Sequence, residues 1–391
     1  MKIRIIIYGI NDYREMIVMQ LHSNCKVIGY SDNNLKITEF DYIPFYPPES
    51  LSNIKCDYIL ISYAEDKEIN AARKILFENN ISFSKIIIYK NFSNVLWNNP
   101  VGFFLKKIGG GVEQLIFGMS HARNDIYVSK LSHRTYSFAS PSLDIFFHNR
   151  YTRLLNSNSF DLKKVSRIII ELPYYAFNYD LSAHKKFILS KMNYFDDIDD
   201  YHNYGKTEEE INHILEFKRF KLLFGRDMYA YDMIHELSYA EFERVGYLHK
   251  IYRAVKKNIE CIKNINAVWK NIFDATIQEN KKLFFELLEN IDKDIDIVIL
   301  ICPFNPVFRL AHKRDISAMK EKFYSILSEV SRDIKVIDLF DDSPTNSSCD
   351  FIDECHMTRN AAYSWTKYLD EKLGRVERYN ESVNLKFRNG K

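Results

Sequence analysis

The sequence has no run that approaches the ~18 apolar residues of a membrane-spanning helix, and it lacks a disulfide or zinc-ribbon cysteine pattern. Its six cysteines are scattered, with no C-x-x-C spacing, which favours a reducing compartment. It also lacks an excess of charge, since 54 Lys and Arg face 52 Asp and Glu, for a net charge of +2. Residues 1–7 resemble a strand rather than a signal peptide. We therefore expect a cytoplasmic protein with no transmembrane segment and no nucleic-acid partner.

The composition is that of an ordinary globular protein, with 46% hydrophobic and 27% charged residues in a chain of 391. A chain of this length can bury two separate cores. Within residues 1–92, apolar runs alternate with helical patterns, which predicts βαβ units and a parallel sheet. The runs expected to form its strands are 3–8, 26–30, 57–62 and 84–89.

The turn after the first run has too few glycines for a dinucleotide fingerprint. That fingerprint needs three glycines, whereas only Gly9 is present and Asp12 stands where a phosphate would approach. Asp32 follows the second run, where a ribose-binding acid would stand, although Asp is also an ordinary turn residue. The region resembles the small Rossmann-like domains of bacterial sugar-modifying proteins. Gly9 and Asp32 are the candidate cofactor-binding residues, but the missing glycines favour a degenerate domain used for scaffolding or partner contacts.

A predicted linker at 93–111 leads to a second domain at 112–391, which opens with a strand that ends in Gly118 and is followed by Ser120. In open α/β sheets, ligands bind at the carboxyl ends of the strands. Backbone N–H groups of the helix that follows can stabilise an oxyanion there. Ser120 is therefore a candidate nucleophile, and an ordinary helix N-cap is the alternative.

Near the C-terminal end, Asp353 and His356 stand three residues apart before a predicted helix. With Ser120 they supply the residue types of a hydrolytic triad in the order Ser, Asp, His. A rival interpretation takes Cys349, Asp353, Cys355 and His356 as metal ligands. Their crowding on one short segment, without a second ligand pair, suits tetrahedral zinc poorly, so we expect no metal.

These two ends resemble the SGNH (GDSL-type) hydrolase superfamily, in particular a bacterial branch found with cell-surface polysaccharide and teichoic-acid genes. The resemblance covers roughly residues 112–391. It implies a flavodoxin-like α/β/α domain with Ser120 as nucleophile, His356 as proton acceptor and Asp353 as the residue that orients the imidazole.

Two further blocks, at 138–147 and 168–182, resemble blocks of the same branch. They make Ser142 and Asn178 candidates for the oxyanion hole, and His121 is a candidate for substrate contact. Each has a plainer alternative: Ser142 fits a helix N-cap, and His121 fits a solvated residue at a helix start. Asn178 lacks the superfamily's usual Gly-x-Asn context.

The expected architecture is thus α/β in two domains, with a helical insertion at about 183–290 in the second. The resemblance implies a serine esterase or O-acyltransferase that acts on carbohydrate, in the modification of a cell-surface polysaccharide or its precursor. The triad itself requires no cofactor, and a transferase would take an acyl donor such as acetyl-CoA. The alternative is a non-catalytic binding or assembly protein of the same kind of pathway, and the oligomeric state stays open.

Overall fold

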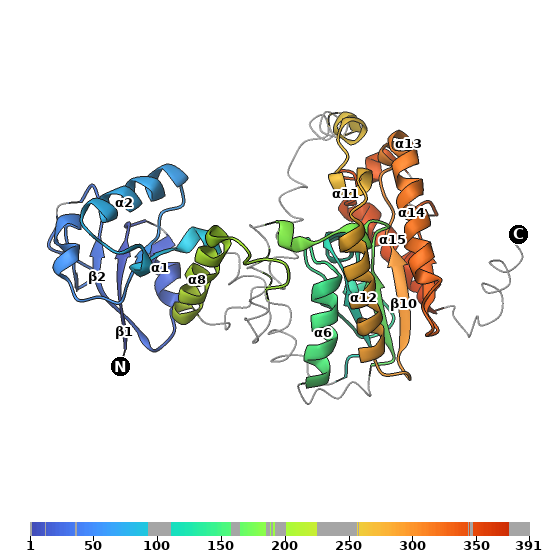
Figure 1. Ribbon diagram of the computed structural model, residues 1–391, viewed down its shortest axis with the longest axis horizontal. Coiled ribbons are helices and arrows are strands. Elements are labelled where there is room, and N and C mark those ends of the chain that lie inside the picture. The colour runs from blue at the N-terminus through green and yellow to red at the C-terminus, as the bar shows by residue number, and fades with distance from the viewer. Residues whose placement is uncertain are drawn as a thin grey trace, which may run out of the picture. The chain divides into compact units, whose positions relative to one another are not determined.

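The computed structural model describes a chain that divides into two compact units. One comprises Met1–Phe103 with Ser182–Asp232, and the other Phe104–Leu181 with Met233–Lys391. Each unit is an α/β structure built on a parallel sheet (Figure 1). The residues described are 2–11, 13–35, 37–92, 111–157, 165–184, 188, 191, 201–224, 256, 258–342, 344 and 347–374.

The first unit contains a four-stranded sheet in the order β2-β1-β5-β6. Residues 5–8 of β1 are all buried, as expected for a parallel strand that is covered on both faces. Ile6 and Tyr8 join Ile69 and Leu76 of α2 in one apolar cluster. The elements of this sheet and its flanks are β1 (Ile3–Tyr8), α1 (Tyr13–Gln20), β2 (Cys25–Ser31), β5 (Tyr58–Ile61), α2 (Asp66–Glu78) and β6 (Ile86–Ile88), with a small hairpin of β3 (Glu39–Phe40) and β4 (Ile43–Pro44).

A helix from much later in the chain, α8 (Glu208–Leu223), completes the first unit (Figure 1). A capping box fixes its start, where Thr207 and Glu210 bond each other's backbone N–H groups. The centroid of the Phe220 ring lies 6.3 Å from that of the Tyr89 ring. The backbone N–H of His22 donates to the carbonyl oxygen of Leu223 at 2.9 Å. The first part of the predicted insertion, up to Asp232, therefore belongs to the first unit, where α8 packs, whereas the part from Met233 belongs to the second.

The second unit contains a five-stranded parallel sheet in the order β11-β10-β9-β7-β8. Numbered within the unit, this order is 2-1-3-4-5. The chain therefore moves outward in one direction from β7 to β8 and in the other from β9, so the carboxyl ends of β7 and β9 form a topological switch point. The strands are β7 (Gln114–Phe117), β8 (Thr135–Ser137), β9 (Arg167–Glu171), β10 (Asp296–Ile301) and β11 (Lys335–Asp338).

Helices cover both faces of this sheet. Phe117 of β7 packs 5.6 Å from Tyr151 of α6, whereas its neighbour Ile116 lies in the cluster of Trp365 from α15. Successive side chains of a strand point to opposite faces, so α6 and α15 lie on opposite sides, and α12 runs beside α6 (Figure 1). The helices are α5 (Ser120–Asp125), α6 (Ile145–Ser157), α11 (Ala267–Lys270), α12 (Asp274–Asn290), α13 (Pro306–Ala311), α14 (Lys313–Leu327) and α15 (Arg359–Gly374).

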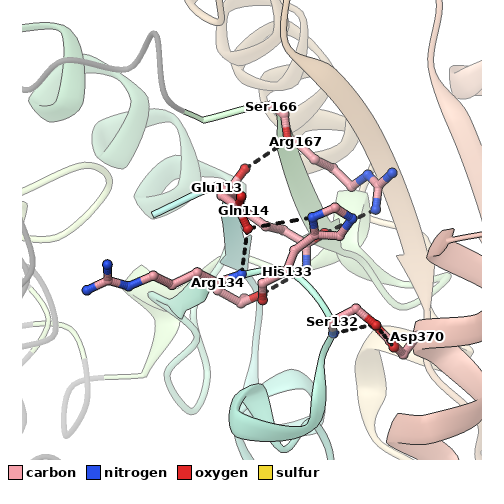
Figure 2. Close-up of polar contacts among 9 residues, drawn as sticks. Glu113, Gln114, Ser132, His133, Arg134, Ser166, Arg167 and Asp370 are labelled. Carbon is pink, nitrogen blue, oxygen red and sulfur yellow. Dashed lines mark hydrogen bonds and ion pairs between the residues drawn. The ribbon is translucent and has the colours of Figure 1, made fainter. Parts of the chain in front are cut away.

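Polar contacts tie the strands together at their amino ends (Figure 2). Arg167 donates from Nη1 to Gln114 Oε1 at 3.2 Å, and the N–H of Arg134 donates to Glu113 Oε2 at 3.0 Å. Ser166 Oγ donates to the carbonyl of Glu113 at 3.1 Å. These bonds join β7 to its two neighbours at the end of the sheet opposite the switch point.

Parts of two predicted features lie outside the described residues, namely the linker except for Gly111, and residues 185–187, 189–190, 192–200, 225–255 and 257 of the helical insertion. Within the described part of the chain, no helix combines the length and the apolar character needed to cross a membrane. The strand β8 was not predicted as such, because its three residues are too few to show a period.

Candidate active site

The strand β7 ends in a turn that only glycine fits. A Cβ on Gly118 would lie 2.6 Å from the Cβ of Ala122 and 3.0 Å from that of Glu171. The missing side chain lets α5 begin close against β9. Ser120 is the first residue of α5, so it stands at the switch point of the sheet, on the edge predicted from the sequence.

Asp353 and His356 form a hydrogen-bonded pair in the loop before α15. His356 Nδ1 lies 2.8 Å from Asp353 Oδ2, and because a carboxylate only accepts, the imidazole donates from this nitrogen. The other oxygen of Asp353 accepts from the backbone N–H groups of Cys355 at 3.0 Å and His356 at 2.8 Å. The pairing leaves His356 Nε2 as the second ring nitrogen, and this buried atom has no hydrogen-bond partner among the described residues.

The electrostatics favour an ion pair at this dyad. Burial opposes ionisation of Asp353, but the hydrogen bond and charge of His356 and two backbone N–H groups outweigh it and lower the pKa of Asp353. Burial also opposes protonation of His356, but the bond to Asp353 and the charges of Asp353, Asp125 and Glu354 outweigh it and raise the pKa of His356. A carboxylate that stabilises the imidazolium is what a general base requires.

His121 lies in the same cluster, but it is neither a solvated residue nor an exposed substrate contact. Its side chain is 2% exposed, and Nδ1 lies 3.0 Å from Glu171 Oε1. The other carboxylate oxygen of Glu171 accepts from the N–H of Met119 at 2.7 Å. The His121 ring stacks on that of His356 with centroids 5.6 Å apart. The site thus holds two carboxylate-backed imidazoles rather than one.

Asp125 connects α5 to the dyad loop, a role that no sequence motif indicated. It is fully buried, and Oδ1 accepts from the N–H of Met357 at 3.0 Å. Its Oδ2 has no partner in the described part of the chain. Burial raises the pKa of Asp125 to about 7, against the opposing effects of His356 and the Met357 N–H.

Ser120 and His356 lie on elements that pack together, since Asp125 bonds the residue after His356 and α5 contacts α15. Within the described residues the two side chains share no hydrogen bond, because Nε2 of His356 has no partner. Catalytic bonds are often long before substrate binds. The structure therefore brings the helix that Ser120 opens and the Asp353–His356 loop together without a hydrogen bond between Ser120 and His356 in the described residues.

Asn178 was predicted for the oxyanion hole, but the structure bonds its side-chain amide elsewhere. Its Nδ2 donates to the carbonyls of Val268 at 2.8 Å and Asn271 at 2.7 Å, and its Oδ1 accepts from the N–H of Phe273 at 2.8 Å. Both amide hydrogens are therefore used to anchor the segment around α11, and none is left for a substrate oxygen.

Ser142 does not cap a helix, contrary to the alternative drawn from the sequence. Asp144 is the cap of α6, with Oδ1 accepting from the N–H of Phe147 at 3.2 Å. Ser142 itself adopts a left-handed backbone conformation with φ of 62°. Its carbonyl accepts from the hydroxyl of Tyr179 at 3.4 Å.

In the first unit, Gly9 follows β1 and Asp32 follows the neighbouring strand β2, and a hydrogen bond joins the two turns. Gly9 has φ of 103°, which favours glycine. Asp32 Oδ2 accepts from the N–H of Ile10 at 3.0 Å and from the hydroxyl of Tyr63 at 2.9 Å. The backbone N–H of Ile10, in the turn where a phosphate would approach, is thus already bonded to Asp32. This favours the interpretation of the first unit as a degenerate dinucleotide-binding domain.

Comparison with known proteins bears on the first unit alone. Residues 1–87 match a family model described as C2185-like, N-terminal. The match spans β1, β2 and β5 and ends within β6, so it does not reach the second sheet. A comparison with curated proteins finds no match to the chain.

Proposed function

We propose that the second unit is a serine esterase or O-acyltransferase that acts on carbohydrate. The observation that carries the proposal is the Asp353–His356 dyad, bonded at 2.8 Å beside the helix that Ser120 opens. The strand order 2-1-3-4-5 is that of flavodoxin-like sheets, and it supports the resemblance of residues 112–391 to SGNH-type hydrolases. The carbohydrate substrate and the link to a surface polymer or its cytoplasmic precursor rest on that resemblance.

In this proposal, Ser120 Oγ attacks the acyl carbonyl carbon as His356 Nε2 takes the hydroxyl proton. Asp353 keeps the imidazole in the tautomer with Nε2 free and stabilises the imidazolium. His356 then returns the proton to the leaving alcohol or thiol, and the ester of Ser120 remains. Water releases the acyl group in an esterase, whereas a sugar hydroxyl accepts it in a transferase that uses a donor such as acetyl-CoA.

The first turn of α5 is the candidate for oxyanion stabilisation. The first N–H groups of a helix have no carbonyl partner within the helix, and those of α5 begin at Ser120 itself. This assignment needs no side-chain amide, which agrees with the engagement of Asn178 elsewhere.

Labelling with a fluorophosphonate probe tests the proposal, together with hydrolysis of an activated acetyl ester. We expect the full chain to be labelled and Ser120→Ala to lose both labelling and hydrolysis while it keeps its melting temperature. Ser132→Ala is the matched control, because Ser132 bonds Asp370 away from the switch point (Figure 2). A folded Ser120→Ala protein that remains active would refute the nucleophile assignment.

A non-catalytic binding or assembly protein is the second candidate. The observation that favours it is the absence of a hydrogen bond from His356 Nε2 to Ser120 within the described residues. A wild-type chain that resists the probe at every pH from 6 to 9, yet binds acylated oligosaccharide, would support this candidate instead.

A further inference from the structure

We propose that His121, Cys355 and His356 form a binding site for Zn²⁺, and that the bound ion blocks the proposed esterase. The metal site goes beyond the proposed function, whereas the inhibition rests on it. The three residues come from the two ends of the second unit, so the sequence alone offered only the ligands of one loop.

The positions of the three side chains suit a transition metal. One ligand atom from each, an imidazole nitrogen or the thiol sulfur, can be chosen so that all lie within 4.8 Å of one another. Zn–N bonds of about 2.0–2.1 Å and a Zn–S bond of about 2.3 Å place tetrahedral ligands roughly 3.3–3.6 Å apart. The side chains would therefore have to move closer together to bind one ion.

The groups behind the two histidines are those that metal-binding histidines use. A ligating imidazole almost always donates its other N–H to a carboxylate or carbonyl, which fixes its tautomer. Here Glu171 lies 3.0 Å from His121 Nδ1 and Asp353 lies 2.8 Å from His356 Nδ1. Nε2 is thus the nitrogen that each ring would offer to an ion, and that of His356 is buried without a partner in the described part of the chain. Cys355 Sγ now lies 3.7 Å from His356 Nδ1, so the thiol would have to turn toward Nε2 to share an ion with it.

The surrounding charge favours a cation. The carboxyl groups of Asp353, Glu354 and Asp125 all act on Cys355 with their charge. A bound divalent ion would draw off the thiol proton and balance the negative groups that now oppose the thiolate.

Binding at this site stops the proposed chemistry because it uses His356 Nε2. That lone pair is the one that takes the proton of Ser120, and an ion that occupies it removes the base. Three protein ligands leave the fourth position for water, so the site needs no further residue. Zinc is the metal expected, since imidazole and thiolate together suit it.

The test measures Zn²⁺ binding to the full, metal-stripped chain by equilibrium dialysis, with Co²⁺ as a spectroscopic substitute whose thiolate charge-transfer band reports sulfur ligation. We expect one ion per chain and a Kd at least tenfold weaker for Cys355→Ser. Cys349→Ser is the control, because Cys349 lies exposed in the same loop and outside the ligand group. No binding, or equal affinity in Cys355→Ser and the parent, would overturn the site.

Inhibition is measured separately, as the Zn²⁺ concentration that halves ester hydrolysis. It should rise at least tenfold in Cys355→Ser relative to that variant's own metal-free rate, and zinc-stimulated hydrolysis would overturn the inhibition. Ser120→Ala should bind Zn²⁺ like the parent although it is inactive. Zinc binding in a chain that the fluorophosphonate probe never labels would therefore reject the proposed function and keep the metal site.

Discussion

Replacing Asp125 by Asn should change the stability of the second unit with a sign that depends on pH. Asp125 is fully buried, and its carboxyl group has a pKa of about 7 instead of the ordinary 3.8. A pKa about three above the ordinary value corresponds to about 4 kcal/mol of penalty for the ionised form. Asn carries no charge and escapes this penalty at all pH values.

The substitution also has a cost that does not depend on pH. Asn keeps an acceptor for the N–H of Met357, but its amide nitrogen brings two N–H donors to the position of Oδ2, where the protonated carboxyl has one O–H at most and the described residues offer no partner. A buried polar group without a partner costs about 1–3 kcal/mol. The net effect at any pH is the difference between this cost and the penalty that the wild-type carboxylate carries there.

The sign follows from the two protonation states. Because the pKa of Asp125 is raised on folding, the folded chain holds its proton to a higher pH than the unfolded chain. The penalty is absent below about pH 4, accumulates between about pH 4 and 7, and is complete above pH 7. We expect Asp125→Asn to be about 1–3 kcal/mol less stable than wild type at pH 4 and about 1–3 kcal/mol more stable at pH 8.

Urea unfolding monitored by tryptophan fluorescence at pH 4 and pH 8 measures this inversion. Asp294→Asn is the matched control, because it removes an exposed carboxylate ahead of β10 and should show no change of sign. A variant of Asp125 that is destabilised equally at both pH values would refute the reasoning from burial. The same substitution should shift the acidic limb of the hydrolysis profile to lower pH, because the charge of Asp125 helps to raise the pKa of His356.

The other predictions concern the dyad and the anchor at α11. Asp353→Asn and His356→Ala should each lower ester turnover by about 10⁴-fold or more, and the double variant by little more than either alone, since triad members act as a unit; additive losses in steady-state kinetics would contradict the dyad. Asn178→Ala should lower the free energy of unfolding by about 1–3 kcal/mol and leave turnover per folded chain near wild type, so a variant with normal stability and lost turnover would restore the oxyanion role.

Most strands of the two sheets, with the exception of β8, could be predicted from the sequence because their signals are local. The buried run of β1 and that of β10 (Asp296–Ile301) are continuous and apolar, as central parallel strands are. The placement of α8 could not be read in this way. Its apolar positions indicate a helix, but which of two sheets covers Phe220 depends on contacts far apart in the chain.

The same distinction between local and long-range contacts applies to the candidate site. Asp353 and His356 are three residues apart, so a single loop brings them together. His121 lies on α5, and its partner Glu171 lies on β9. The burial of the pair follows from the closeness of β7 to β9 at Gly118. The bonds of Asn178 could not be predicted, because an asparagine in the loop after a strand fits an oxyanion donor and a loop anchor equally, and its three partners lie about 90 residues later in the chain.

The division of the first unit between two stretches of chain has a consequence for synthesis on the ribosome. Tyr89 and Phe92 emerge early, whereas the rings of α8 that pack on them, Phe217 and Phe220, come more than a hundred residues later. At ~5–20 residues per second the interval is roughly 6–30 s. During this interval the aromatic side chains that follow β6 lack their partners from α8, and we expect premature association between growing chains to begin at these rings.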